Sequence, residues 1–170
     1  IEIDVQRSFN NHKNCDPQIL KNLLKAYAAH DREVSYCQGM NYMMGFLYIN
    51  LQDPELSFKC FCKTMELIRP LFDHEFKQLK KVFFKFTRIL ELYLPELSDH
   101  FKREKVEPSY FVAPWFITGF SSAFQYSTHS MFLEKIWDQF LLDGVKIIYK
   151  VGLIILLEFK DKLLDMKFDQ

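Results

Sequence analysis

The stretch LKKVFFKFTRILELYLP, residues 79–95, decides the fold class of this chain. Its apolar residues recur at spacings of three and four, which places them on one side of an α-helix, whereas a half-buried strand would alternate with a period of two. Proline lacks a backbone N–H and restricts the residue before it, so Pro95 is expected to end the helix. The buried side is predicted to consist of Leu79, Val82, Phe83, Phe86, Leu90 and Tyr93.

The helical period extends through most of the chain. Pro17 is expected to open one helix, and Asp53 is a typical N-cap residue for another that begins at Pro54. Near the end, residues 131–142 and 145–162 form two predicted helices, separated by the pair Asp143-Gly144. Strand and hairpin patterns are absent. We therefore predict one all-α domain spanning residues 1–170, with about eight or more helices. A further expected helix follows Gln38 and buries Met40, Met43, Met44, Leu47 and Leu51.

Both ends of the chain are expected to be truncated relative to the complete domain. Ile1 already falls within an amphipathic segment. A new apolar pattern begins close to the other end and comprises Leu163, Leu164, Met166 and Phe168.

The composition excludes several classes of function. Lysine plus arginine number 22 and aspartate plus glutamate also number 22, so no overall field attracts the chain to nucleic acid. Four cysteines lack the spacing of a disulfide framework, which favours reduced thiols and a cytoplasmic location. No phosphate-cradling glycine loop occurs, so the chain is not expected to bind its own nucleotide cofactor. His12 and Cys15 have half of a zinc spacing without a second half, so no metal site is predicted.

Asp4 and Arg7 are three residues apart and would share a helix face. Two interpretations are open. The pair is either a surface ion pair, which contributes at most about 1 kcal/mol, or a device in which Asp4 holds the guanidinium in one pose. A positioned arginine can stabilise charge that develops on a phosphoryl group, because its planar fork matches the oxygens and stays protonated.

The fragment YCQGMN, residues 36–41, offers an amide at the start of an apolar helix. Gln38 would either satisfy an unpaired backbone amide, or orient a water or hold a loop, since an amide both donates and accepts hydrogen bonds. Gly39 allows another backbone to approach closely. Tyr36 is either a core residue or an aromatic wall beside the glutamine.

A basic stripe lies opposite the buried side of the helix that ends near Pro95. The stripe is either a solvated helix face or a contact for an acidic partner or an anionic lipid surface. It consists of Lys77, Lys81, Lys85 and Arg88.

Taken in order, these motifs resemble the TBC domain, the family of GTPase-activating proteins for Rab small GTPases. The pattern I-x-x-D-x-x-R is carried by Ile1, Asp4 and Arg7, and Y-x-Q followed by G-x-N is carried by residues 36–41, including Asn41. The segments PSYFVAPWFITGF (108–120) and KIWDQFLLDG (135–144) are similar to later parts of the family's pattern. Ser8 departs from it, because threonine is common after the arginine.

The resemblance implies that Arg7 is an arginine finger and Gln38 a glutamine finger, with Ile1, Asp4, Tyr36, Gly39 and Asn41 in supporting positions. Both fingers would act in trans on a Rab that carries GTP and Mg²⁺, so the chain would need no cofactor and have no catalytic cycle of its own. It would reach endomembranes peripherally through the GTPase. The alternative is a non-catalytic module that binds a Rab or scaffolds a trafficking complex.

Overall fold

The computed structural model describes residues 1–9, 12–73, 75–125 and 130–167 of the chain. Within these ranges the chain forms eleven α-helices, one 3₁₀-helix and no strand. The all-α fold class predicted from the helical periodicity is therefore confirmed.

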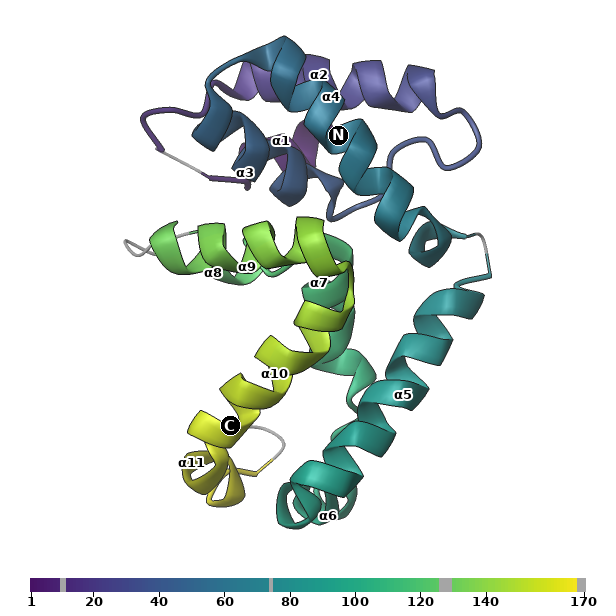
Figure 1. The fold of residues 1–170 in the computed structure, drawn as a ribbon, viewed down its shortest axis with the longest axis vertical. Coiled ribbons are helices and arrows are strands. Elements are labelled where there is room, and N and C mark those ends of the chain that lie inside the picture. The colour runs from purple at the N-terminus through teal and green to yellow at the C-terminus, as the bar shows by residue number, and fades with distance from the viewer. Residues whose placement is uncertain (10–11, 74, 126–129, 168–170) are drawn as a thin grey trace.

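The first four helices form one group, which lies at the top of Figure 1. Sequence signals set where two of them begin. The side chain of Asp16 accepts hydrogen bonds from the backbone of Gln18 and Ile19, and Asp53 caps the backbone N–H of Leu56. In both cases a proline occupies the first helical position, where its missing N–H costs nothing. The helices are α1 (Glu2–Gln6), α2 (Pro17–His30), α3 (Met40–Leu51) and α4 (Pro54–Ile68).

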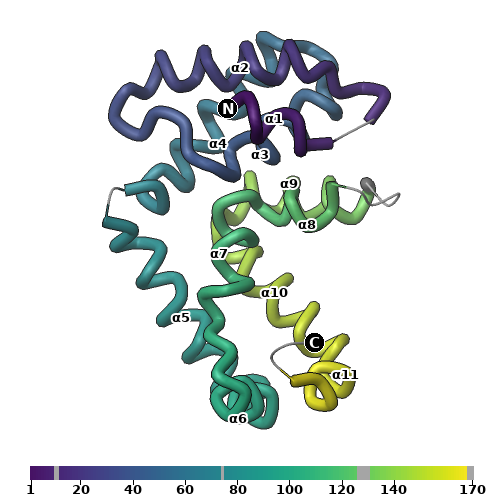
Figure 2. The backbone as a smooth tube through the Cα atoms, turned by 180° about the vertical axis from the view of Figure 1, so that it is seen from behind, coloured from purple at the N-terminus to yellow at the C-terminus, as the bar shows by residue number. Residues whose placement is uncertain are grey.

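The remaining helices form a second group below the first. The 3₁₀-helix η1 (Arg69–Phe72) leads into it, and α7 lies between α5 and α10 in Figure 2, in contact with both. α6 and α11 pack together at the far end. The helices are α5 (Lys77–Tyr93), α6 (Pro95–Arg103), α7 (Ser109–Thr118), α8 (Ser121–Phe124), α9 (Ser130–Asp143), α10 (Lys146–Glu158) and α11 (Lys160–Leu164).

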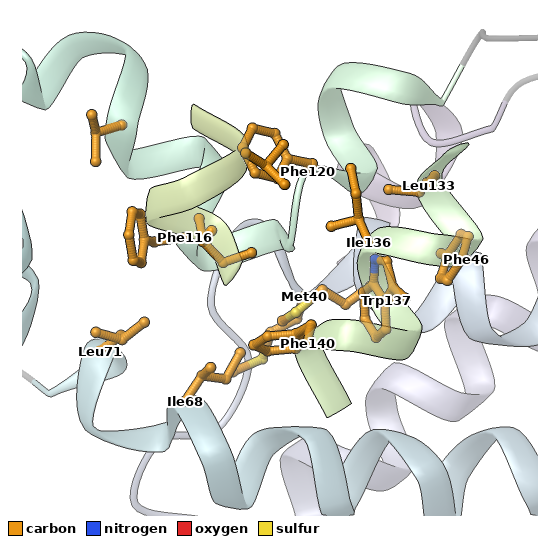
Figure 3. Close-up of a cluster of buried hydrophobic side chains, with 14 of the residues drawn as sticks. Met40, Phe46, Ile68, Leu71, Phe116, Phe120, Leu133, Ile136, Trp137 and Phe140 are labelled. Atoms are coloured by element: carbon orange, nitrogen blue, oxygen red, sulfur yellow. The ribbon is translucent and has the colours of Figure 1, made fainter. Parts of the chain in front are cut away.

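A continuous apolar core joins the two groups (Figure 3). α3 contributes Met40 and Phe46, and the ring of Phe46 lies 4.8 Å from that of Trp137 on α9. The Trp137 Nε1 donates a hydrogen bond to the Gly119 carbonyl over 3.1 Å, so its one polar atom is satisfied within the core. The other labelled members are Ile68, Leu71, Phe116, Phe120, Leu133, Ile136 and Phe140.

The deciding helix, α5, buries Leu79, Val82, Phe86 and Leu90 as predicted, and Phe83 is half-buried. The prediction for Tyr93 is wrong, because its side chain is 67% exposed. The buried position at this end belongs instead to Leu94, which follows the helix with non-helical dihedral angles (φ −133°, ψ 58°).

The single helix predicted for residues 145–162 is also wrong. α10 ends at Glu158, and α11 begins at Lys160 after a junction at Phe159. No glycine or proline marks this break. α11 packs instead against α6, where Lys160 pairs with Glu96, so tertiary packing sets the break. Of the apolar pattern expected at this end, Leu163 and Leu164 are partly buried, whereas Phe168 lies outside the described residues.

An ion-pair cluster ties the end of α2 to η1. The Arg69 Nε lies 2.8 Å from Asp31 Oδ2, and its Nη2 lies 2.7 Å from Glu33 Oε2. Hydrogen bonding from Arg69 lowers the pKa of Asp31 well below its usual range, against the opposing effect of burial. The pair therefore stabilises the fold above the unfolded-state pKa of about 4, and this stabilisation is lost as the pH falls through the folded-state value.

Arg69→Ala is accordingly expected to lower the urea midpoint at pH 7. The difference from the wild type should stay constant down to about pH 4 and shrink below it, because the unfolded chain then binds a proton at Asp31 that the native wild type does not. Urea unfolding curves at a series of pH values measure this difference. Lys63→Ala, which removes an exposed ion pair with Glu66, is the matched control. An Arg69 effect that did not depend on pH would contradict the assignment.

Candidate functional site

Arg7 is held by Asp4 at the end of α1. The Arg7 Nη2 lies 2.5 Å from Asp4 Oδ1, at the spacing of one helical turn. The Asp4 side chain is only 15% exposed, whereas that of Arg7 is 46% exposed. The carboxylate of the pair is therefore mostly buried, whereas the arginine side chain is partly exposed and accessible to a partner.

Asp4 is itself held by the segment that contains Gln38. The Tyr36 hydroxyl donates a hydrogen bond to Asp4 Oδ2 over 2.6 Å, across 32 positions of sequence. Burial, and then the hydrogen bond to Asp4, raise the pKa of Tyr36 well above its usual range. The Asp4–Arg7 pair is therefore part of a network between two elements and differs from an isolated surface ion pair.

Asn41 continues this network at the start of α3. It is fully buried, and its Oδ1 accepts a hydrogen bond from the Gly39 backbone N–H over 3.0 Å. The Asn41 Nδ2 donates to Ser8 Oγ over 2.6 Å, and Ser8 Oγ donates to the Asp4 carbonyl over 2.5 Å. The backbone on either side of Arg7 is thereby fixed to the turn that carries Gln38.

Gly39 is required at its position for two reasons. Its φ of +109° lies in the region that favours glycine. A Cβ at this position would also lie 3.3 Å from side-chain atoms of Ile117 on α7. The sequence predicted the approach of another backbone, and this prediction is wrong, because the atoms nearest to such a Cβ belong to the side chains of Ile117 and Thr118.

The side chain of Gln38 is exposed and makes no hydrogen bond within the part of the chain that the structure describes. α3 begins after it with Gly39 as N-cap and no side-chain cap, so Gln38 does not satisfy a helix terminus. It lines an open groove of about 570 Å³. The groove continues along Phe72, Phe76 and Leu79 on one side and Ile117 and Thr118 on the other.

Two supporting residues were not identified from the sequence. Ser8 is buried in the network described above. Phe9 is also buried, and a Cβ at Gly45 would lie 2.6 Å from its ring, so the glycine admits Phe9 against α3. The role of Ser8 could have been predicted, because its hydroxyl follows Asp4 by four residues, the spacing at which it can reach the Asp4 carbonyl. The contact between Phe9 and Gly45 could not, because no sequence pattern links the two residues.

Most of the residues expected at the site are thus brought together. One network joins Asp4, Arg7, Tyr36, Gly39 and Asn41, and Gln38 lies within the same turn. Ile1 packs against the core as N-cap of α1, and its carbonyl accepts the Val5 N–H. Arg7 is not among the residues that line the groove beside Gln38. Among the described residues, no three potential ligands cluster to hold a metal ion.

Comparisons with known proteins show which family the chain belongs to. Its residues 1–164 match the Rab-GTPase-TBC domain. Human TBC1 domain family member 1 is 32% identical over 164 residues, which cover 92% of this chain and 14% of that protein. Rab GTPase-activating protein tbc-11 of Caenorhabditis elegans is 29% identical over 177 residues, which cover 98% of this chain and 18% of that protein. The chain thus spans less than a fifth of either relative.

A solved structure supports the fold assignment. The TBC domain of a flagellar RabGAP from Chlamydomonas aligns with a TM-score of 0.81 and 23% identity, covering 97% of this chain and 56% of that one. The fold agrees over nearly the whole chain, and the sequence match extends over residues 1–164. The chain belongs to the Rab-GTPase-TBC domain family.

Proposed function

We propose that this chain stimulates GTP hydrolysis by a Rab-family small GTPase and supplies Arg7 and Gln38 to the GTPase in trans. Membership of the Rab-GTPase-TBC domain family supports the partner class, as does the name of the C. elegans relative. The observation that carries the proposal is the network in which Tyr36 holds Asp4 and Asp4 holds Arg7, next to an unengaged Gln38.

The proposed chemistry follows from what GTP hydrolysis requires. Negative charge is spread over the γ-phosphoryl oxygens in the transition state, and an attacking water must be oriented in line. The guanidinium of Arg7 would neutralise that charge, and the amide of Gln38 would orient the water. GTP and Mg²⁺ would be carried by the GTPase, so the chain would contribute two side chains and no catalytic cycle of its own.

The geometry fits a group that acts on a partner. Asp4 fixes the guanidinium while almost half of the Arg7 side chain stays exposed, so the N–H groups that do not face Asp4 are accessible to a phosphate. Pre-organisation of this kind places charge where it is needed without reorganisation during the reaction.

By this proposal the protein acts in the cytoplasm, at endomembranes where the GTPase resides. No described helix has the length and apolar character needed to cross a bilayer.

Single-turnover hydrolysis on a panel of GTP-loaded Rab proteins tests the proposal. The chain is expected to accelerate hydrolysis on at least one Rab, and binding is measured in parallel by titration. Binding to a Rab without a change in its hydrolysis rate would favour the non-catalytic module. Neither binding nor acceleration across the panel would contradict the partner class.

A further inference from the structure

The outward side of α5 carries a dense basic surface. Its residues recur at helical spacing and face away from the buried residues Val82, Phe86 and Leu90. Figure 1 shows α5 along one edge of the molecule, with α7 and α10 on its other side. At 1.5 Å per residue the surface is roughly 22 Å long. We define the α5 basic face as Lys77, Lys80, Lys81, Phe84, Lys85, Arg88 and Leu92, all of which are exposed.

The charge of this face is local and mostly uncompensated. α5 contains five basic residues and one acidic residue, Glu91, in a chain whose formal net charge is zero. Glu91 lies 2.7 Å from Arg88 and 2.9 Å from Lys102, so it is already engaged. Within the described ranges no carboxylate pairs with Lys80, Lys81 or Lys85. Lys77 lies 2.7 Å from Glu75, so the cations without a carboxylate partner in the described residues are the three in the middle of the face. A solvated helix face would gain from acid–base pairs at helical spacing, and α5 has one within its own length, Arg88–Glu91.

Two large apolar side chains stand among these cations. Phe84 is 68% exposed and Leu92 is 73% exposed, and neither side chain packs on the core. Exposing them to water has a cost that a solvated helix face would not need. A surface that binds a bilayer combines basic side chains, which attract anionic headgroups, with apolar side chains that enter the headgroup boundary.

We propose that the α5 basic face binds a bilayer surface that carries anionic headgroups. The lysines would be attracted to the negative surface potential, and Phe84 and Leu92 would enter the boundary between headgroups and acyl chains. An acidic protein would satisfy the lysines equally well, but it would offer no general reason for two exposed apolar residues at the centre and end of the face. A bilayer surface accounts for both observations.

This contact goes beyond the proposed action on a GTPase and does not depend on it. Leu79 lines the groove beside Gln38 and lies on the buried side of α5, so the α5 basic face points away from that groove. Membrane binding would therefore leave the groove open to a second partner.

Vesicle co-sedimentation tests the proposal without any GTPase. The chain is mixed with vesicles of phosphatidylcholine alone and with vesicles that contain 30% phosphatidylserine (about the anionic content needed for a strong surface potential). Binding is expected only to the anionic vesicles and should weaken as salt is raised, because the Debye length shortens. Lys81→Glu together with Lys85→Glu should lower the partition coefficient on the order of a hundredfold.

Two further variants make the result specific. Phe84→Ala, which keeps every charge, should lower the partition coefficient about tenfold through the lost apolar insertion. Reversal of Lys59 and Lys63, exposed lysines on α4, is the matched control and should leave binding nearly unchanged. Far-UV circular dichroism checks that each variant folds.

Three results would overturn the proposal. The first is no binding to anionic vesicles at low salt. The second is equal loss of binding in the α4 control, which would indicate attraction without a defined site. The third is an unchanged partition coefficient for Phe84→Ala together with equally tight binding to soluble polyglutamate, which would identify an acidic protein as the occupant.

Discussion

Replacement of Arg7 by alanine is expected to slow stimulated GTP hydrolysis by about 10³- to 10⁵-fold, which corresponds to about 4 to 7 kcal/mol of activation free energy. In the proposed arrangement, Arg7 is the one cation that this chain brings to the γ-phosphoryl oxygens, so its loss leaves their negative charge without that stabilisation. A surface ion pair contributes at most about 1 kcal/mol, so the two interpretations of the Asp4–Arg7 pair differ by orders of magnitude in rate. Single-turnover hydrolysis at saturating protein measures the effect.

Two control variants separate catalysis from charge and folding. Arg7→Lys keeps a positive charge but loses the planar fork, so most of the rate loss should persist. Arg32→Ala removes an exposed arginine that forms no ion pair within the described residues, and its stimulated rate should match the wild type. Equal unfolding midpoints would show that all three proteins fold. If Arg7→Ala retained stimulation within tenfold of the wild type, Arg7 could not be the finger.

Local patterns predicted the helices well because they report which residues share a face. The spacing in α5 identified Leu79, Val82, Phe86 and Leu90 correctly, and helices begin at Pro17 and directly after Asp53 as predicted. Errors arose where packing between distant elements decides the outcome. The break at Phe159 follows from the docking of α11 on α6, and a one-dimensional pattern contains no information about that contact.

At the candidate site, too, contacts within one helix were predicted from the sequence, whereas contacts between distant segments were not. Spacing predicted that Asp4 would meet Arg7, because both lie on one turn of one helix. It could not predict that Tyr36 would reach Asp4, or that Asn41 would reach Ser8, because these hydrogen bonds join segments more than 30 positions apart. The groove beside Gln38 likewise combines three separate parts of the chain. The resemblance to the TBC family named the residues, and the structure supplies their contacts.

Gln38→Ala is expected to slow stimulated hydrolysis by about 10²- to 10³-fold, the effect of removing one positioned polar group from a transition state. Folding should be unaffected, since the Gln38 side chain is exposed and makes no hydrogen bond within the described ranges. Gln18→Ala is the matched control, because Gln18 is also exposed and its side chain bonds only to Asn22 on its own helix among the described residues. Its rate should match the wild type.

A variant GTPase reveals which glutamine orients the water. Many small GTPases use a glutamine of their own for this task, so the Rab is prepared with that residue replaced by alanine. If Gln38 orients the water, the wild-type chain still stimulates the altered Rab, whereas Gln38→Ala shows the same large loss of stimulation on both Rabs. If the Rab glutamine orients it, the altered Rab loses stimulation and Gln38→Ala keeps it on the normal Rab. The second pattern would leave Arg7 as the one finger and assign Gln38 to the contact surface, because its amide would then bind the GTPase without touching the reacting water.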